Sequence, residues 1–162
     1  MSQRNNRNLA RGARSLVTTR VFASPRELVW TAWTAPEHLA RWWGPFGFST
    51  TTQAFEFRPG GAWRFVLHGP DGRDYHNRIT FEQIVQPERI RYRHDGGDDV
   101  EPVQFCTTVT FEDLGGAGTR LTLRAEFPTA AERDRIVRGY GADRGAVETL
   151  ARLADYLAQL KA

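Results

Sequence analysis

Residues 147–160, VETLARLADYLAQL, are the stretch that decides the fold. Apolar side chains recur at helical spacing, at Val147, Leu150, Leu153 and Leu157, with charged residues between them. This spacing predicts a long amphipathic helix near the end of the chain. Such a helix must bury its apolar face against another element, so the rest of the chain has to supply a surface that fits it.

The helical pattern begins earlier, at the capping box Thr129-Ala130-Ala131-Glu132, but three glycines interrupt it. Each of Gly139, Gly141 and Gly145 costs about 1 kcal/mol relative to Ala in a helix interior. Two interpretations stay open. Either the helix breaks at these glycines, or another group approaches its backbone closely.

The surface that receives this helix is predicted to be a sheet. Seven segments are typical of half-buried strands, through alternation of apolar and polar residues or through β-branched and aromatic residues, and Gly- and Pro-rich turns or an acidic loop separate most of them. The strand segments are 15–23, 50–57, 62–68, 73–85, 89–94, 103–112 and 119–127. Residues 95–102, DGGDDVEP, form the acidic loop.

Two short helices are predicted between the first and second strands. Ser24-Pro25-Arg26-Glu27 predicts a helix start with Ser24 as the N-cap, and Thr34-Ala35-Pro36-Glu37 predicts a second one. The fold class is therefore α+β. We expect a curved antiparallel sheet of about six to seven strands that wraps around a long C-terminal helix, in the arrangement of a helix-grip fold. A curved sheet around one helix leaves space between them, which is a candidate ligand cavity.

Charge is divided unevenly along the chain. The net charge is +3, but residues 1–24 hold five arginines and no acidic residue, so the remainder sums to −2. We expect a basic, flexible tail over residues 1–14 and a single domain over residues 15–162. A nucleic-acid-binding domain would carry its basic stripe on the folded body, so no nucleic-acid partner is expected.

Length and composition limit the remaining classes. A chain of 162 residues can bury a full core without metals or disulfides, and Cys106 is its single cysteine. No apolar run approaches the ~20 residues of a membrane span, and no apolar segment near the start is typical of a secretory signal. We therefore expect a cytoplasmic protein.

Titratable residues give no pattern typical of a catalytic or metal site. The four histidines, His38, His68, His76 and His94, lack the spacing of metal ligands. No base or cation is evident beside Cys106 to form a thiolate. We accordingly expect no catalytic residue, no metal and no cofactor.

The aromatic residues carry the binding hypothesis. Many of them share the alternation phase of the concave face with polar residues, and an apolar pocket with a few polar groups is the usual form of a small-molecule site. The residues predicted to line the cavity are Trp42, Trp63, Phe65, Tyr75, Asn77, Tyr92, His94, Phe105, Thr107, Val109, Tyr140 and Val147.

Several motifs resemble the SRPBCC (START-like, helix-grip) superfamily. The clearest are RPGGAWRF at 58–65, GPDG at 69–72, PERI at 87–90 and RWWGP at 41–45. Within that superfamily the chain is similar, over about residues 15–160, to homologues of the activator of heat-shock-protein-90 ATPase. The resemblance implies the helix-grip fold. Its members include lipid and hormone carriers, aromatic polyketide cyclases, oxygenase domains and co-chaperone domains, so the resemblance does not select one function.

Three functional hypotheses follow, in this order. The first is a non-catalytic domain that binds a small apolar or aromatic ligand. The second is a protein-interaction or co-chaperone-like module with an exposed apolar patch at Trp42, Trp43 and Phe46. The third is an aromatase/cyclase-type enzyme, whose acid and base would come from Glu56, His76, Arg78 or His94. A homodimer is a possible assembly in each case.

Overall fold

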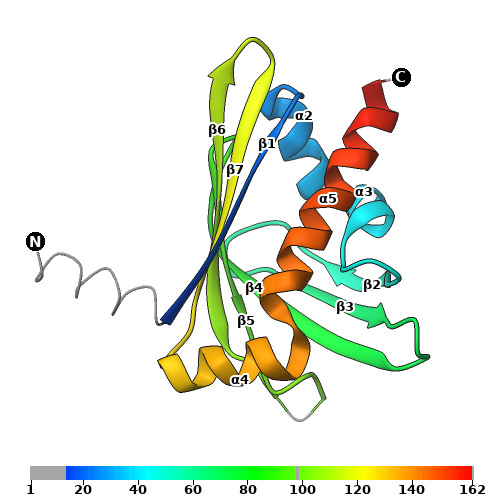
Figure 1. Cartoon of the computed structure of the whole chain (residues 1–162), viewed down its shortest axis with the longest axis vertical. Helices are drawn as coiled ribbons and strands as arrows, with labels where there is room; N and C mark the ends of the chain where they lie inside the picture. Colours follow the sequence, from blue (N-terminus) through cyan, green and yellow to red (C-terminus); the bar gives the residue numbers. More distant parts are fainter. Residues whose placement is uncertain (1–13, 98, 162) are drawn as a thin grey trace, which may run out of the picture.

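The computed structural model describes residues 14–97 and 99–161 and contains one antiparallel sheet with helices on one face (Figure 1). The tail predicted over residues 1–14 lies outside the described residues except for Arg14. The elements are β1 (Ser15–Phe22), α2 (Arg26–Trp33), α3 (Pro36–Trp42), β2 (Ser49–Phe55), β3 (Ala62–His68), β4 (Asp74–Val85), β5 (Arg89–His94), β6 (Phe105–Gly115), β7 (Gly118–Glu126), α4 (Ala130–Tyr140) and α5 (Ala142–Lys161).

The α+β prediction is confirmed. The seven strands pair in the order β1-β7-β6-β5-β4-β3-β2, so β1 and β2 are the two edges. Every pairing is antiparallel. The register places Tyr92 opposite Thr107 and His94 opposite Phe105 across β5 and β6. These four side chains therefore form two rows on the same face of the sheet.

The C-terminal helical pattern breaks into two helices at Gly141. This residue has a φ of 61°, a left-handed conformation that a residue with a Cβ adopts only with strain. The first interpretation of the glycines is therefore correct at this position. In Figure 1, α4 lies at the foot of the sheet, while α5 runs along its inner face. The Thr129 side chain accepts a hydrogen bond from the Glu132 N–H at 3.0 Å, as the capping box predicts.

The prediction that Ser24 caps α2 is wrong. Pro25 is the N-cap of this helix and makes no side-chain capping hydrogen bond. Ser24 is instead buried, and its carbonyl oxygen accepts a hydrogen bond from the Thr119 hydroxyl at 2.7 Å. The Ser24 backbone thus ties the β1–α2 connection to the start of β7.

Side-chain size changes along the inner face of α5. Its C-terminal half presents the fully buried Leu150, Leu153 and Leu157 to the main core. Its N-terminal half presents Ala142 and Ala146, which are only partly buried. Small side chains cannot fill the same width between helix and sheet, so the two halves pack differently. Within the described part of the chain, no helix is long and apolar enough to cross a membrane.

The leucine face of α5 should dominate the stability of the fold. Leu153 has no exposed surface, so Leu153→Ala should lower the free energy of unfolding by about 2–5 kcal/mol. Val147→Ala, at a side chain that is 55 % exposed on the same helix, should change it by less than about 0.5 kcal/mol. Urea unfolding monitored by tryptophan fluorescence measures both. Equal losses in the two variants would contradict this assignment of the helix face.

Candidate functional site

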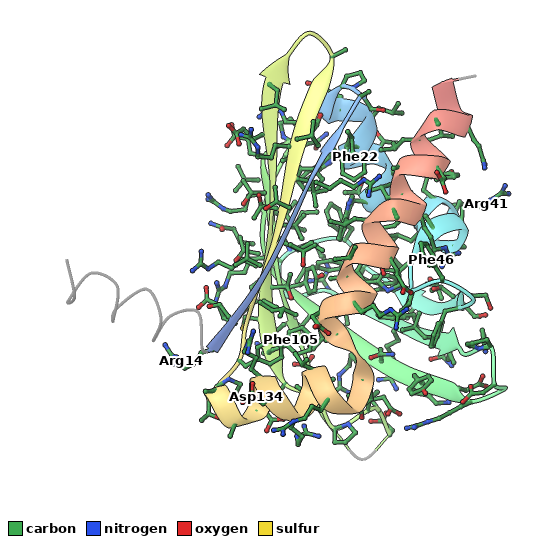
Figure 2. The ribbon with its side chains drawn as sticks, in the orientation of Figure 1. Arg14, Phe22, Arg41, Phe46, Phe105 and Asp134 are labelled. Atoms are coloured by element: carbon green, nitrogen blue, oxygen red, sulfur yellow. The ribbon has the colours of Figure 1, made fainter. Side chains whose placement is uncertain are left out.

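Two small pockets lie side by side between the sheet and the helices α4 and α5. The first has a volume of about 220 Å³ and the second a volume of about 160 Å³. His94, Phe105 and Ala142 border both. The rings of His94 and Phe105 stack with centroids 4.3 Å apart, so this pair forms a common wall. Figure 2 shows Phe105 near the foot of the sheet, beside α4.

The structure brings together seven of the twelve residues predicted to line a cavity. Tyr75, Asn77 and Tyr140 border the first pocket, together with the shared His94 and Phe105. Tyr92 and Thr107 border the second. They meet because β4, β5 and β6 are neighbours in the sheet and because α4 carries Tyr140 across its foot.

Four of the other predicted residues lie in solid core. Trp42, Phe65 and Val109 are buried and border neither pocket, while Trp63 borders a gap of about 10 Å³. The reason is that α2 and α3 fill this half of the sheet with tryptophans. The ring centroids of Trp33 and Trp42 lie 5.1 Å apart, and the Trp42 indole donates to the Ala32 carbonyl at 3.0 Å.

Val147 is more than half exposed and borders neither pocket. Its placement in the cavity is therefore corrected. Successive residues of a helix are rotated by about 100°, and Ala146 and Thr149 take the positions that face the second pocket. Val147 belongs to the run of apolar residues at helical spacing in the sequence, but it lies outside the face of α5 that packs toward the sheet.

The remaining pocket residues were missed for two different reasons. Leu16, Thr18, Leu67, Leu123 and Ala125 lie on strands, where alternation indicates a face but not which positions on that face stay open. Loop and helix residues gave no such signal; the loop members include Trp43, Pro45, Phe48 and Glu101, and the helix members include Ile136 and Ala146. Val103 belongs to the predicted strand 103–112 but lies just before β6, which begins at Phe105.

A single arginine, Arg152, fixes the loop between α3 and β2, which borders the site. From α5, Arg152 Nη1 donates to the carbonyl oxygens of Gly44 at 2.9 Å, Phe48 at 3.1 Å and Trp43 at 3.2 Å. Glu148 accepts from the Phe46 N–H at 3.0 Å on the same side. The loop between α3 and β2 is thereby fixed to α5, which positions Trp43 and Phe48 as pocket walls.

Charged groups gather at one side of the first pocket. Glu101 Oε1 accepts hydrogen bonds from the Tyr140 hydroxyl at 3.0 Å and from Arg73 Nη2 at 3.1 Å. The Arg73 guanidinium also lies 4.3 Å from the centroid of the Tyr75 ring. Burial and the bond to Glu101 raise the pKa of Tyr140, so this hydroxyl stays protonated at neutral pH. The acidic loop therefore contributes a neutralised carboxylate rather than a free charge.

His94 is the polar residue common to both pockets. Burial lowers its pKa to about 4, an effect that the nearby charge of Asp95 opposes only in part. The Asp95 carboxylate accepts hydrogen bonds from Thr80 and Arg93. In residues 14–97 and 99–161, neither ring nitrogen of His94 has a hydrogen-bond partner. His94 is thus a neutral imidazole with its hydrogen-bonding capacity unused.

Tyr92 lies beside His94 in the second pocket. Burial raises the pKa of its hydroxyl, and a hydrogen bond with Thr107 opposes the shift. The hydroxyl stays protonated at neutral pH for that reason. The second pocket therefore holds neutral polar groups, and its apolar walls include Phe127 and Leu123.

The other candidates for acid–base chemistry lie away from the pockets. Glu56 is exposed and pairs with Arg58 at 2.7 Å. His76 is exposed, and Arg78 pairs with Asp95 at 3.5 Å. Among the residues that the structure describes, no group of three or more His, Cys, Asp or Glu side chains could hold a metal ion.

Comparisons with known proteins agree with this architecture. The family model for "Activator of Hsp90 ATPase homolog 1-like protein" matches residues 23–158. Solved structures of proteins from three bacteria are similar. The one from Arthrobacter aurescens has a TM-score of 0.84 and 25 % identity, with 91 % of this chain and 88 % of that chain covered. The one from Nitrosomonas europaea has a TM-score of 0.81 and 26 % identity, with 92 % of this chain and 97 % of that chain covered. The one from Mycobacterium smegmatis has a TM-score of 0.80 and 25 % identity, with 93 % of this chain and 94 % of that chain covered. The comparison with curated proteins found no match.

The pKa of His94 predicts a pH dependence of stability. The folded pKa of about 4 lies below the ordinary value of 6.5, so the unfolded chain binds more protons between these pH values. The free energy of unfolding should fall by about 3 kcal/mol as the pH drops from 6.5 to 4. Urea unfolding at a series of pH values measures this loss.

Two variants separate His94 from other titrating groups. His94→Leu should remove most of the loss above pH 4, whereas His76→Leu, at an exposed histidine, should retain it. Asp95 acts in a lower range: burial raises its pKa, but the bonds from Thr80 and Arg93 lower it further, below the ordinary 3.8. An unchanged slope in His94→Leu would show that another group causes the loss.

Proposed function

Because the chain belongs to the Activator of Hsp90 ATPase homolog 1-like family, we propose that residues 15–162 act as one domain that binds a small, mostly apolar ligand between the sheet and the helices α4 and α5. The observation that carries the proposal is the pair of adjoining pockets with His94 and Phe105 as their common wall. Apolar side chains form most of both linings, and a few polar groups converge there. This is the usual composition of a small-molecule site.

Hydrophobic burial supplies the affinity that such a site needs. Apolar surface that leaves water contributes about 25 cal/mol per Å², and the walls include Leu67, Val103 and Phe127. Binding of this kind requires no covalent chemistry. The narrow inner face of α5 at Ala142 and Ala146 leaves the ligand room beside the sheet.

The two alternatives receive less support from the geometry. The interaction module needed an apolar patch at Trp42, Trp43 and Phe46, but Trp42 is fully buried and Phe46, 57 % exposed, is the one exposed member. The cyclase needed two inward groups from Glu56, His76, Arg78 and His94. Only His94 of these four borders either pocket.

Native mass spectrometry tests the proposal. The protein, purified without denaturation, should carry a reproducible small-molecule mass that is lost under denaturing conditions. Ala142→Phe should abolish this mass, because residue 142 borders both pockets and a phenyl ring there would occupy them. Ala158→Phe makes the same substitution at an exposed position of α5 and should retain the mass.

Three outcomes would count against the proposal. A bare chain that also binds no apolar compound from a defined set would remove its basis. A ligand mass that survives in a folded Ala142→Phe variant would place the ligand elsewhere. Protein partners retained by the bare chain would favour the interaction module, and the same spectra report whether the chain is a monomer or a homodimer.

A further inference from the structure

His94 has an unused hydrogen-bonding capacity at the centre of the proposed site. Its flat face is occupied, because the ring stacks on Phe105 with an angle of 21° between the planes. The ring nitrogens lie at the edge of the imidazole and have no partner within residues 14–97 and 99–161. His94 is only partly buried, so its ring edge stays accessible from the pockets that it borders, and a ligand group with a matching donor or acceptor can hydrogen-bond it there.

The charge state of His94 limits the chemistry of that partner. A neutral imidazole offers one N–H donor and one bare nitrogen acceptor. A hydroxyl group can donate or accept, so it fits either tautomer. A carboxylate can only accept and an ammonium can only donate. Both would also lose the hydration of a full charge in a mostly apolar pocket, a much larger cost.

Glu101 gives little compensation to a charged ligand. Its Oε1 atom already accepts from Arg73 and Tyr140. The negative charge is therefore balanced by the guanidinium before any ligand enters. The other carboxylate oxygen of Glu101 stays open, but it shares the charge that Arg73 balances. Asn77 and His94 offer neutral polar atoms in the same pocket, and the Asn77 amide nitrogen donates to the Tyr75 carbonyl at 3.0 Å.

Pocket volume limits the size of the ligand. An apolar cavity of about 150 Å³ holds one benzene molecule. The pockets of about 220 Å³ and about 160 Å³ each match one six-membered ring with a small substituent. Aromatic rings border both spaces, from Phe48, Tyr75 and Phe105 in the first to Trp43, Tyr92 and Phe127 in the second. Such walls favour an aromatic ligand through offset or edge-to-face ring contacts.

We propose that the site selects neutral single-ring aromatic compounds with a hydroxyl group, and that His94 is the specificity-determining residue that hydrogen-bonds this hydroxyl. The inference rests on the proposed function and adds the ligand class to it. The ring lies against the aromatic wall beside Phe105, and the phenolic hydroxyl bonds one imidazole nitrogen. No proton is transferred in this step, because both partners stay neutral.

Isothermal titration with 4-methylphenol, toluene and 4-methylbenzoate tests the selection at pH 7. The full chain should bind 4-methylphenol about fivefold more tightly than toluene, as one net hydrogen bond of about 1 kcal/mol implies. It should bind 4-methylbenzoate more weakly than either. His94→Leu should bind 4-methylphenol no more tightly than toluene. His76→Leu, at an exposed histidine of the same strand as Asn77, should keep the preference.

A second measurement needs no variant. The ¹⁵N resonances of the His94 ring in the wild-type protein should shift with 4-methylphenol and stay in place with toluene. Equal affinities for the two compounds, or a preference that persists in His94→Leu, would overturn the inference and leave the proposed binding function standing. Failure of all three compounds to bind would also overturn it. The proposed function fails separately, if the native mass spectra show no ligand that depends on residue 142.

Discussion

The packing of α5 against the curved sheet is the constraint on which the rest of the structure depends. Leu150, Leu153 and Leu157 fill the space between helix and sheet along one half of this contact. Along the other half, the small side chains of Ala142 and Ala146 border the second pocket and leave its space unfilled. A folded core tolerates unfilled volume only where the surrounding elements are held apart. The two pockets are the consequence of this change in side-chain size along one helix.

Polar interactions hold the surrounding loops in place. Arg152 fixes the loop between α3 and β2 through backbone carbonyls, and Arg73 with Tyr140 fixes Glu101. The Asp95 carboxylate is satisfied by Arg93 and Thr80. These charged groups are paired with each other. His94, which is neutral, is the polar residue that both pockets share. The chemistry of the site therefore depends on contacts that lie mostly outside it.

Most of the predicted lining residues lie on the inner face of the sheet, whether or not they border a pocket. The difference between the two groups is what packs against them. Strand alternation placed Phe65, Val109 and His94 on the inner face, and all three do lie there. Only His94 borders a pocket, because α2 and α3 fill the half of the sheet over Phe65 and Val109 with tryptophan rings. Alternation reports the direction of a side chain and carries no information on what packs above it.

The sequence by itself determined the order of the strands and helices along the chain, the α+β class, the helix-grip arrangement and the inner face of most of the strands. Local periodicity is sufficient for these features, because backbone geometry couples residue spacing to side-chain direction. Only the tertiary structure decided that the last helical pattern breaks at Gly141, that Val147 faces outward and that Glu101 reaches the first pocket. The reason is physical: the volume left between elements depends on side chains that meet from distant parts of the chain, and no local pattern records which of them meet.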